Sequence, residues 1–143
     1  MTAGPSYEYR VELGKTREFA KALQSSNPEF CEGPRPVVLP TFLVTATQWG
    51  PDDFNLTEFV GFDRKRILHG SQEYRYFGEP PRAGDVLTAH VRLTDRYEKK
   101  GGRGGLMQFA VVSTEFRDAS GAVVAESRMT LIETAPKPAG GQQ

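Results

Sequence analysis

Histidine is the side chain best suited to acid–base chemistry near neutral pH, and His69 stands in a polar motif, HGSQEYRYF. Gln72 and Glu73 follow closely, so a local acid–base site is one interpretation. In an extended strand His69 and Glu73 lie on one face and Gln72 points to the other, so His69 and Glu73 meet only at a bulge such as Gly70 would supply. Pocket lining, a subunit contact and a structural hydrogen bond are the alternative roles for His69.

A second stretch of interest is QSSNPEF, residues 24–30, which follows an amphipathic run. Serine and asparagine side chains bond their own backbone, and the residue before Pro28 is pushed out of the α region. An ordinary turn that ends a helix is therefore one interpretation. A loop that shapes the wall of a binding site is the other.

Composition excludes several classes of function. Lys plus Arg and Asp plus Glu each total 18, so no bulk field draws the chain toward nucleic acid or an anionic membrane. Cys31 is the single cysteine, so no disulfide forms within the chain. The two His lie far from it in the sequence, so we expect no metal site, and no cofactor is expected. No apolar run approaches the roughly 20 residues of a membrane span, and MTAGPSYEYR lacks the apolar segment of a secretory signal. The cytoplasm is the expected location.

The elements that must position these residues begin with a strand over residues 7–13 and a surface helix over residues 15–24. A loop then leads to PTFLVTATQW, an uncharged segment that opens with Pro40, a residue suited to a first helical turn. Its apolar periodicity predicts a buried helix from Thr41 to Trp49, with a buried strand as the rival.

Four runs in the second half predict half-buried strands, over residues 66–77, 86–99, 106–116 and 122–133. Turn-forming separators join them, so we expect an antiparallel meander. The residues expected on its covered face are Leu87, Ala89, Val91 and Leu93 in the second strand and Met107, Phe109 and Val111 in the third. An antiparallel sheet wrapped around one buried helix is the α+β arrangement called the hot-dog fold.

The order of these motifs resembles the N-terminal, FAS1-type domain of MaoC-like dehydratases. The resemblance rests on "NP", "LPTF", "LHGSQEYRYFGEPPRAGD" and "DRYEKKGG". It covers about residues 7–134 as one domain, with residues 1–6 and 135–143 as flexible tails. It implies that the chain serves the hydration or dehydration of 2-enoyl or 3-hydroxyacyl thioesters of CoA or of an acyl-carrier protein.

The resemblance also implies a degenerate active site. The loop of active relatives reads Gly-Asp-x-Asn-Pro-(Ile/Leu)-His, and matching it on Asn27 and Pro28 puts Ser25 at the aspartate position and Phe30 at the histidine position. Neither a hydroxyl nor a phenyl ring replaces an acid–base pair that shuttles protons near neutral pH. No confident catalytic residue therefore remains in this loop.

A similar departure marks the start of the central helix. Active relatives begin it with His-Gly, whose amide stabilises the thioester oxygen, whereas this chain has Pro40 and Thr41. Proline has no amide hydrogen, so only the N–H of Thr41 is left for that role, with ordinary packing of a helix start as the alternative. The residues that the resemblance assigns to substrate binding are Asn27, Pro28, Phe30, Thr41, His69, Gly70 and Gln72.

The expected function is that of a non-catalytic subunit that shapes the acyl channel beside a catalytic MaoC-like partner, with the isolated chain inactive. The partners implied are an acyl thioester and a second hot-dog chain, in a homodimer or a heterodimer. Two alternatives stay open. One is a non-enzymatic homodimer that binds acyl-CoA, and the other is a hot-dog thioesterase.

Overall fold

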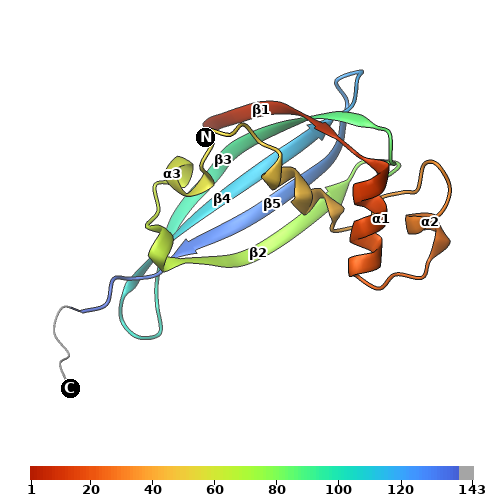
Figure 1. The fold of residues 1–143 in the computed structure, drawn as a ribbon. Coiled ribbons are helices and arrows are strands. Elements are labelled where there is room, and N and C mark those ends of the chain that lie inside the picture. Colours follow the sequence, from red (N-terminus) through yellow and green to blue (C-terminus); the bar gives the residue numbers. More distant parts are fainter. Residues whose placement is uncertain (139–143) are drawn as a thin grey trace.

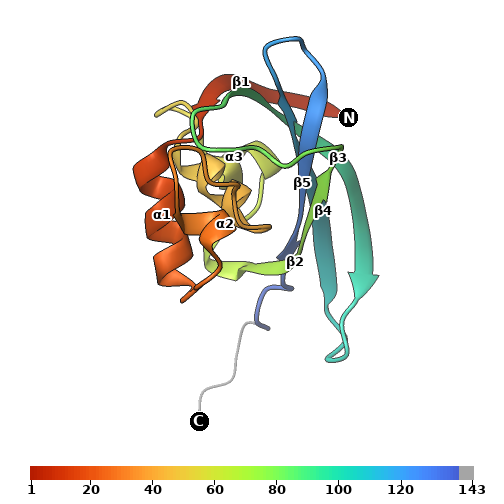
Figure 2. The ribbon, with the colours of Figure 1, turned by 90° about the vertical axis from the view of Figure 1, so that its right-hand side faces the viewer.

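One antiparallel sheet of five strands, in the order β1-β3-β4-β5-β2, organises the chain. The computed structural model describes residues 1–138. Helical segments lie against one face of the sheet, and the opposite face is bare (Figures 1 and 2). The elements in chain order are β1 (Thr2–Arg10), α1 (Leu13–Ala22), α2 (Pro28–Cys31), the 3-10 helix η1 (Phe42–Gln48), α3 (Leu56–Val60), the 3-10 turn η2 (Arg64–Arg66), β2 (Ile67–Tyr76), β3 (Val86–Lys100), β4 (Leu106–Arg117) and β5 (Val123–Glu133).

The four predicted strands are confirmed as β2 to β5, and no bound differs from the prediction by more than one residue. The predicted meander is correct only for β3, β4 and β5, which pair in succession. β2 pairs with β5 instead of β3, so its connection to β3 crosses from one side of the sheet to the other. Alternation predicts that a segment is extended, but not which strand becomes its neighbour.

The first strand starts earlier than the sequence predicts. β1 begins at Thr2, which lies opposite Leu93 of β3, so most of residues 1–6 belong to the sheet and not to a flexible tail. Pro5 stands where the pairing with β3 is interrupted, between Ala3 and Ser6. At the other terminus residues 135–138 form no helix or strand, and residues 139–143 of the expected tail lie outside the described residues.

The central segment is a helix, as expected, and the rival strand is wrong. It is a 3-10 helix, however, and only Phe42, Leu43 and Ala46 are buried, whereas Trp49 is 52% exposed. The hydroxyl of Thr45 donates to the Phe42 carbonyl at 2.9 Å, a local bond that competes with the α-helical ladder. The tighter helix turns Trp49 away from the sheet, and Lys15 lies over its ring at 4.3 Å from the centroid.

The covered face of β4 is not the predicted one. Residues opposite one another on paired strands share a face, and Phe116 lies opposite Ala89 while Val112 lies opposite Leu93. The even-numbered residues of β4 therefore join the core beneath the helices. Phe109 points to the other face, where its ring stacks on Tyr97 at 4.7 Å. β4 is central and apolar on both sides, so its alternation does not indicate which side is covered.

A further helix, α3, lies between the predicted central helix and the first predicted strand, where the sequence patterns indicate neither a helix nor a strand. The signals were present, because the Asn55 side chain accepts from the amides of Thr57 and Glu58, and Gly61 ends the helix in the left-handed conformation. Val60 is fully buried against the sheet. This helix covers the half of the inner face that the short η1 leaves open.

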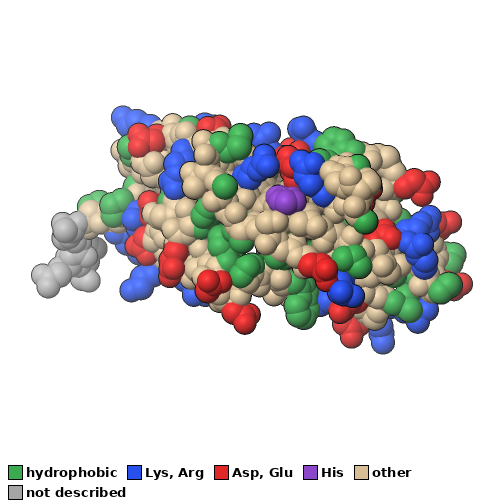
Figure 3. Space-filling model, turned by 90° about the horizontal axis from the view of Figure 1, so that it is seen from above, with side chains coloured by type: hydrophobic (Ala, Val, Ile, Leu, Met, Phe, Trp, Pro, Cys, Tyr) green, Lys and Arg blue, Asp and Glu red, His purple; other side chains and the backbone are tan. Residues whose placement is uncertain are grey.

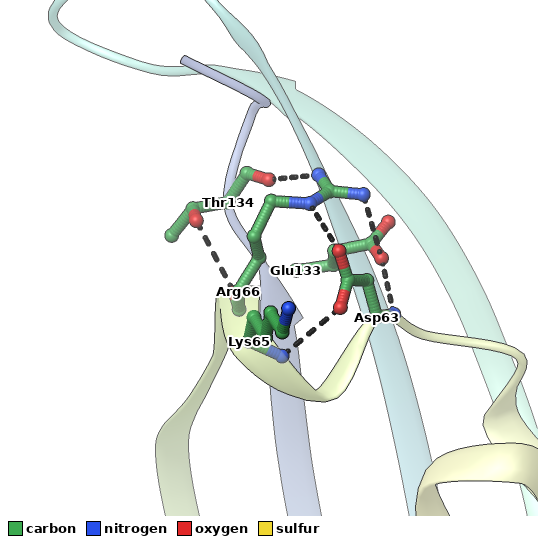
Figure 4. Close-up of polar contacts among 5 residues, drawn as sticks. All are labelled: Asp63, Lys65, Arg66, Glu133 and Thr134. Carbon is green, nitrogen blue, oxygen red and sulfur yellow. Dashed lines mark hydrogen bonds and ion pairs between the residues drawn. The ribbon is translucent and has the colours of Figure 1, made fainter.

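The turn between α3 and β2 is tied to the end of β5 by one arginine (Figure 4). The Arg66 guanidinium donates to Asp63 and Glu133, each at 3.1 Å, and to the Thr134 carbonyl at 2.5 Å. A bond from the Lys65 amide, followed by that from Arg66, lowers the pKa of Asp63. The start of β2 is therefore held in place from its outer end.

Candidate functional site

The NP stretch forms the first turn of α2, so the predicted turn is a short capped helix. The Asn27 side chain accepts from the Glu29 amide at 3.0 Å, and Pro28 occupies the first helical position, where no amide is needed. The Val37 amide donates to the Glu29 carbonyl at 2.9 Å and ties the following segment to this helix. The turn therefore stabilises the local structure, and it also sets the position of Phe30, which belongs to α2.

Phe30 lines an open groove of about 670 Å³. The groove lies between α2, the segment before η1 and the last residues of β2. Its wall is mostly apolar, and Tyr76 of β2 contributes an aromatic ring. The lining residues are Glu29, Phe30, Val37, Val38, Pro40, Tyr76, Gly78, Glu79, Pro80 and Arg82.

The polar groups of the groove belong to its rim. Glu29 and Glu79 are exposed, and the Arg82 guanidinium lies 4.0 Å from the Glu79 carboxylate. The Tyr76 hydroxyl donates to the Pro40 carbonyl at 2.7 Å, and burial raises the pKa of Tyr76 to about 12. Tyr76 is therefore a neutral hydrogen-bond donor at physiological pH. No histidine is among the lining residues. The groove is therefore better suited to binding an apolar acyl chain than to proton transfer.

Three tyrosine hydroxyls fix η1 above the sheet. Besides Tyr76, the Tyr7 hydroxyl donates to the Ala46 carbonyl at 2.7 Å, and the Tyr9 and Thr45 hydroxyls lie 2.5 Å apart. Because the Thr45 hydroxyl already donates to a carbonyl, the Tyr9 hydroxyl is the donor in this pair. The anchored helix keeps Pro40 and the exposed Thr41 in place beside the groove.

Ser25, which the resemblance matches to the aspartate of active relatives, is not among the residues that line the groove. Its amide donates to the Ala20 carbonyl at 3.0 Å, which ends α1 after Gln24 has turned into the left-handed region at φ 55°. Of the loop residues, only Phe30 and its neighbour Glu29 therefore reach the groove.

The face assignment predicted for the His69 motif is wrong. The pairing of β2 with β5 shifts by one residue at Gly70, so His69 lies opposite Leu131 and Gln72 lies opposite Met129. Leu131 belongs to a buried cluster and the partly buried Met129 packs against it, so His69 and Gln72 share the inner face and Glu73 lies on the outer one. The bulge exists, but it separates His69 from Glu73 instead of joining them.

The bulge needs glycine because a Cβ at Gly70 would lie 2.8 Å from the Cδ1 atom of Ile132. A ring nitrogen of His69 lies 3.1 Å from the Ser71 carbonyl oxygen. The side-chain amide of Gln72 donates to the Ser127 hydroxyl at 2.8 Å. Seven residues of strand at about 3.3 Å each separate His69 from Tyr76, so within one chain His69 is roughly 23 Å from the groove.

Sequence reasoning missed several residues of the groove. For Tyr76 the sequence did contain an indication, because the alternation of Gln72, Tyr74 and Tyr76 after the bulge puts all three on the inner face. Val37, Val38 and Arg82 had none, because an isolated bridge between Val37 and Arg82 brings two loops together. Within residues 1–138 no group of three or more potential ligands forms a metal site, and no helix combines the length and apolar character that a membrane crossing requires.

Together, the antiparallel sheet, the helix packed on its inner face and the groove at one end of that helix define a hot-dog domain. The chain belongs to the family described as the FAS1-like dehydratase domain region, whose model matches residues 3–127. Solved structures of similar fold include the HadBC (3R)-hydroxyacyl-ACP dehydratase complex of Mycobacterium tuberculosis, at a TM-score of 0.71 and 22% identity over 92% of this chain and 93% of that one. A MaoC-like dehydratase superposes at 0.72 with 24% identity, over 94% of this chain and 42% of the other.

Sequence relatives span nearly the same length. A UPF0336 protein of Thermobifida fusca is 28% identical over 149 residues, which covers 96% of this chain and 94% of the relative. A UPF0336 protein of a Parafrankia species is 34% identical over 141 residues, covering 91% and 87%.

Proposed function

We propose that this chain is the non-catalytic subunit of a 3-hydroxyacyl-thioester dehydratase or hydratase, and that it shapes the acyl channel beside a catalytic MaoC-like partner. The observation that carries the proposal is the position of Phe30. The resemblance puts Phe30 at the histidine position of active relatives, and its side chain lines a mostly apolar groove of about 670 Å³, a volume that suits part of an acyl chain. Family membership supplies the class of reaction.

The surroundings of Phe30 support a binding role over a catalytic one. No histidine lines the groove, and Ser25 is not among its lining residues, since its backbone amide is bonded to the end of α1. Pro40 has no amide to stabilise an oxyanion, and its carbonyl is taken by the Tyr76 hydroxyl. Losing one general acid or base costs on the order of 10²- to 10⁴-fold in rate, and here both members of the pair are replaced.

The partner would bring the aspartate and histidine that this chain lacks. Two of the solved structures similar to this chain are complexes of two named components, HadBC and ChsH1-ChsH2 of M. tuberculosis. A gene beside this one that encodes an intact Asp-x-Asn-Pro-x-His loop would identify the partner.

A thioesterase is the less favoured function because its His-Gly motif leads into the central helix. In this chain Pro40 and Thr41 precede η1, and His69 and Gly70 lie in β2. A homodimer that binds acyl-CoA without converting it remains the second candidate, since the groove by itself suits binding.

The test is to co-purify the chain with the product of such a neighbouring gene and to follow the hydration of enoyl-CoA at the absorbance of the conjugated thioester. The isolated chain should convert crotonyl-CoA and longer enoyl-CoA at no more than background. The complex should be active, and its activity should disappear when the histidine of the partner's loop is replaced. Robust turnover by the homogeneous isolated chain would contradict the proposal. Binding of acyl-CoA by the isolated chain, with no activity when the neighbouring gene product is added, would favour the binding homodimer.

A further inference from the structure

Three segments meet at the end of the sheet that lies away from the groove: the η2 turn, the tip of the β3–β4 hairpin and the residues that follow β5 (Figures 1 and 2). The Thr134 amide donates to the Arg66 carbonyl at 2.9 Å and joins two of these segments. A Cβ at Gly105 would collide with the Cβ of Ala135, so the hairpin tip touches the same stretch of chain. The three segments therefore form one continuous surface.

Positive charge is concentrated on this surface. The whole chain has equal numbers of basic and acidic residues, yet residues 63–66, 96–106 and 133–138 together hold eight Lys or Arg against three Asp or Glu. On the face seen from above, by contrast, Lys and Arg side chains are interspersed with Asp and Glu (Figure 3). The net charge of zero thus conceals a positive end, balanced by an excess of acid over the rest of the chain.

Two of the eight basic side chains are occupied within the fold. Arg66 is held by the carboxylates of Asp63 and Glu133, and Arg96 donates to the Val60 carbonyl. The other six are exposed, and within residues 1–138 none of them forms an ion pair. We call these six residues the basic end: Arg64, Lys65, Lys99, Lys100, Arg103 and Lys137.

Exposed aliphatic side chains lie at the same end of the sheet. Glu133, the last residue of β5, lies opposite Gln108 of β4, so the hairpin beyond Gln108 extends past the end of β5. Leu106 on this extension is 51% exposed, and Leu68 at the start of β2 is 55% exposed. Lys and Arg next to exposed aliphatic residues suit a membrane interface, where apolar burial and attraction to anionic lipids act together.

The position of the basic end argues against two other polyanions. It lies at the Ile67 end of β2, nine residues or about 30 Å from Tyr76, so it is not placed to hold the phosphates of a thioester bound in the groove of this chain. Nucleic acid requires aromatic faces on which bases stack. On the hairpin the rings of Tyr97 and Phe109 stack on each other, and the Lys99 ammonium lies 5.2 and 5.3 Å from their centroids.

A lipid surface fits the remaining features. It meets a projecting hairpin tip without a matching pocket, and it accepts aliphatic side chains that water otherwise surrounds. Its field falls off within a Debye length, about 8 Å at physiological ionic strength. Only the basic end would lie within that distance, so the acidic residues elsewhere in the chain do not cancel the attraction.

We propose that the basic end docks this domain on an anionic phospholipid bilayer, with its Lys and Arg side chains against the phosphate head groups and Leu106 in the interface. Each Lys or Arg close to such a surface strengthens binding about fivefold. The groove stays about 30 Å from the lipid and open to its ligand. The inference uses no residue of the groove, so it stands independently of the proposed function.

The first experiment is sedimentation of the full chain with vesicles of phosphatidylcholine alone and with vesicles of equal parts phosphatidylcholine and phosphatidylglycerol. The chain should sediment with the mixed vesicles, remain in solution with the neutral ones, and be released from the mixed vesicles as the salt concentration rises. No binding to the mixed vesicles, or equal binding to both kinds, would overturn the inference.

Matched variants locate the contact. Lys100→Gln with Arg103→Gln removes two charges of the basic end and should weaken binding to the mixed vesicles about tenfold or more. Arg17→Gln with Lys21→Gln makes the same change of net charge on α1, at the opposite end (Figure 1), and should change binding less than about twofold. Equal losses for the two pairs would show that net charge, and not the basic end, governs binding.

Leu106→Ser separates the apolar contribution from the charge. It should weaken binding to the mixed vesicles about threefold or more, since a leucine side chain leaves the interface, and the salt dependence should be unchanged. Unchanged binding would overturn the placement of Leu106.

A fluorescent label tests which end meets the lipid. Gly102 accepts a side chain, because a Cβ there meets no atom within 4 Å. In a Cys31→Ser background, an environment-sensitive fluorophore on Gly102→Cys should brighten with the mixed vesicles, whereas the same fluorophore on Ser26→Cys should not. The reverse result would overturn the orientation. Binding of polyglutamate or single-stranded DNA without binding of vesicles would assign the basic end to an acidic macromolecule and overturn the lipid proposal.

Discussion

The Tyr9→Phe variant should be less stable than the original protein at neutral pH and more stable at high pH, as judged by the free energy of unfolding. The ring of Tyr9 is 1% exposed, and its hydroxyl donates to Thr45 at 2.5 Å. In Tyr9→Phe the Thr45 hydroxyl still donates to the Phe42 carbonyl, so no buried donor is orphaned. The substitution should therefore lower the free energy of unfolding by only about 1 kcal/mol at pH 8.

Above pH 10 the difference in the free energy of unfolding between the two proteins should change sign. Burial raises the pKa of Tyr9 from 10.0 to about 12, so the folded state retains a proton that the unfolded state releases above pH 10. A raised pKa gives stability that is complete below pH 10 and is lost as the pH rises toward 12, at about 1.4 kcal/mol per pH unit. The original protein loses roughly 2 to 3 kcal/mol from this group, and Tyr9→Phe loses none of it.

The two free energies of unfolding should therefore cross near pH 11, as measured by urea denaturation at half-unit pH steps. The contributions of the other buried tyrosines, whose pKa burial raises first of all, are shared by both proteins, and only the smaller charge effect of Tyr9 on the pKa of Tyr76 differs between them. Thr45→Val is the matched control, because it removes the same hydrogen bond and leaves Tyr9 free to titrate, so it should stay less stable at every pH. If Tyr9→Phe loses stability with pH as steeply as the original, the reasoning is refuted.

Two further substitutions test the groove and the bulge. Phe30→Ala should weaken the binding of a long-chain acyl-CoA to the complex about tenfold, because a buried aromatic contributes on the order of 1.5 to 3 kcal/mol, and should change short-chain binding little. Calorimetry with the two ligands measures this, and equal losses would contradict it. Gly70→Ala should lower the free energy of unfolding by about 1 to 3 kcal/mol, since the new Cβ meets the Ile132 side chain at 2.8 Å and the Thr130 carbonyl at 3.2 Å. Gly102→Ala, with no atom within 4 Å, should change little, and similar denaturation midpoints for the two variants would show that the bulge tolerates a side chain.

The strands were predictable because their signal is local. Alternation over residues 86–99 and 106–116 specified β3 and β4 almost to the residue. Hairpin turns also fixed the order β3, β4, β5. The position of β2 was not predictable, because a long connection from Phe77 to Asp85 permits either neighbour. The same limit applied to the covered face of β4, where both faces are apolar.

Part of the candidate site was likewise predictable from the sequence, and part was not. The resemblance to MaoC-like dehydratases predicts that Ser25 and Phe30 stand where active relatives have an acid–base pair, and residue type alone determines that Pro40 offers no amide hydrogen. These statements need no coordinates, because they depend on which atoms a side chain possesses.

Only the tertiary structure decided what surrounds those residues. It placed Phe30 in the same groove as Tyr76, which lies 46 residues further along the chain, and it left Ser25 outside that groove. It also converted Gly70 into a bulge that moved Gln72 to the side of His69. Which residues share a face or a cavity depends on register, bulges and loop closure between distant segments. Such contacts are set by packing across the whole sheet, so no local pattern of the sequence specifies them.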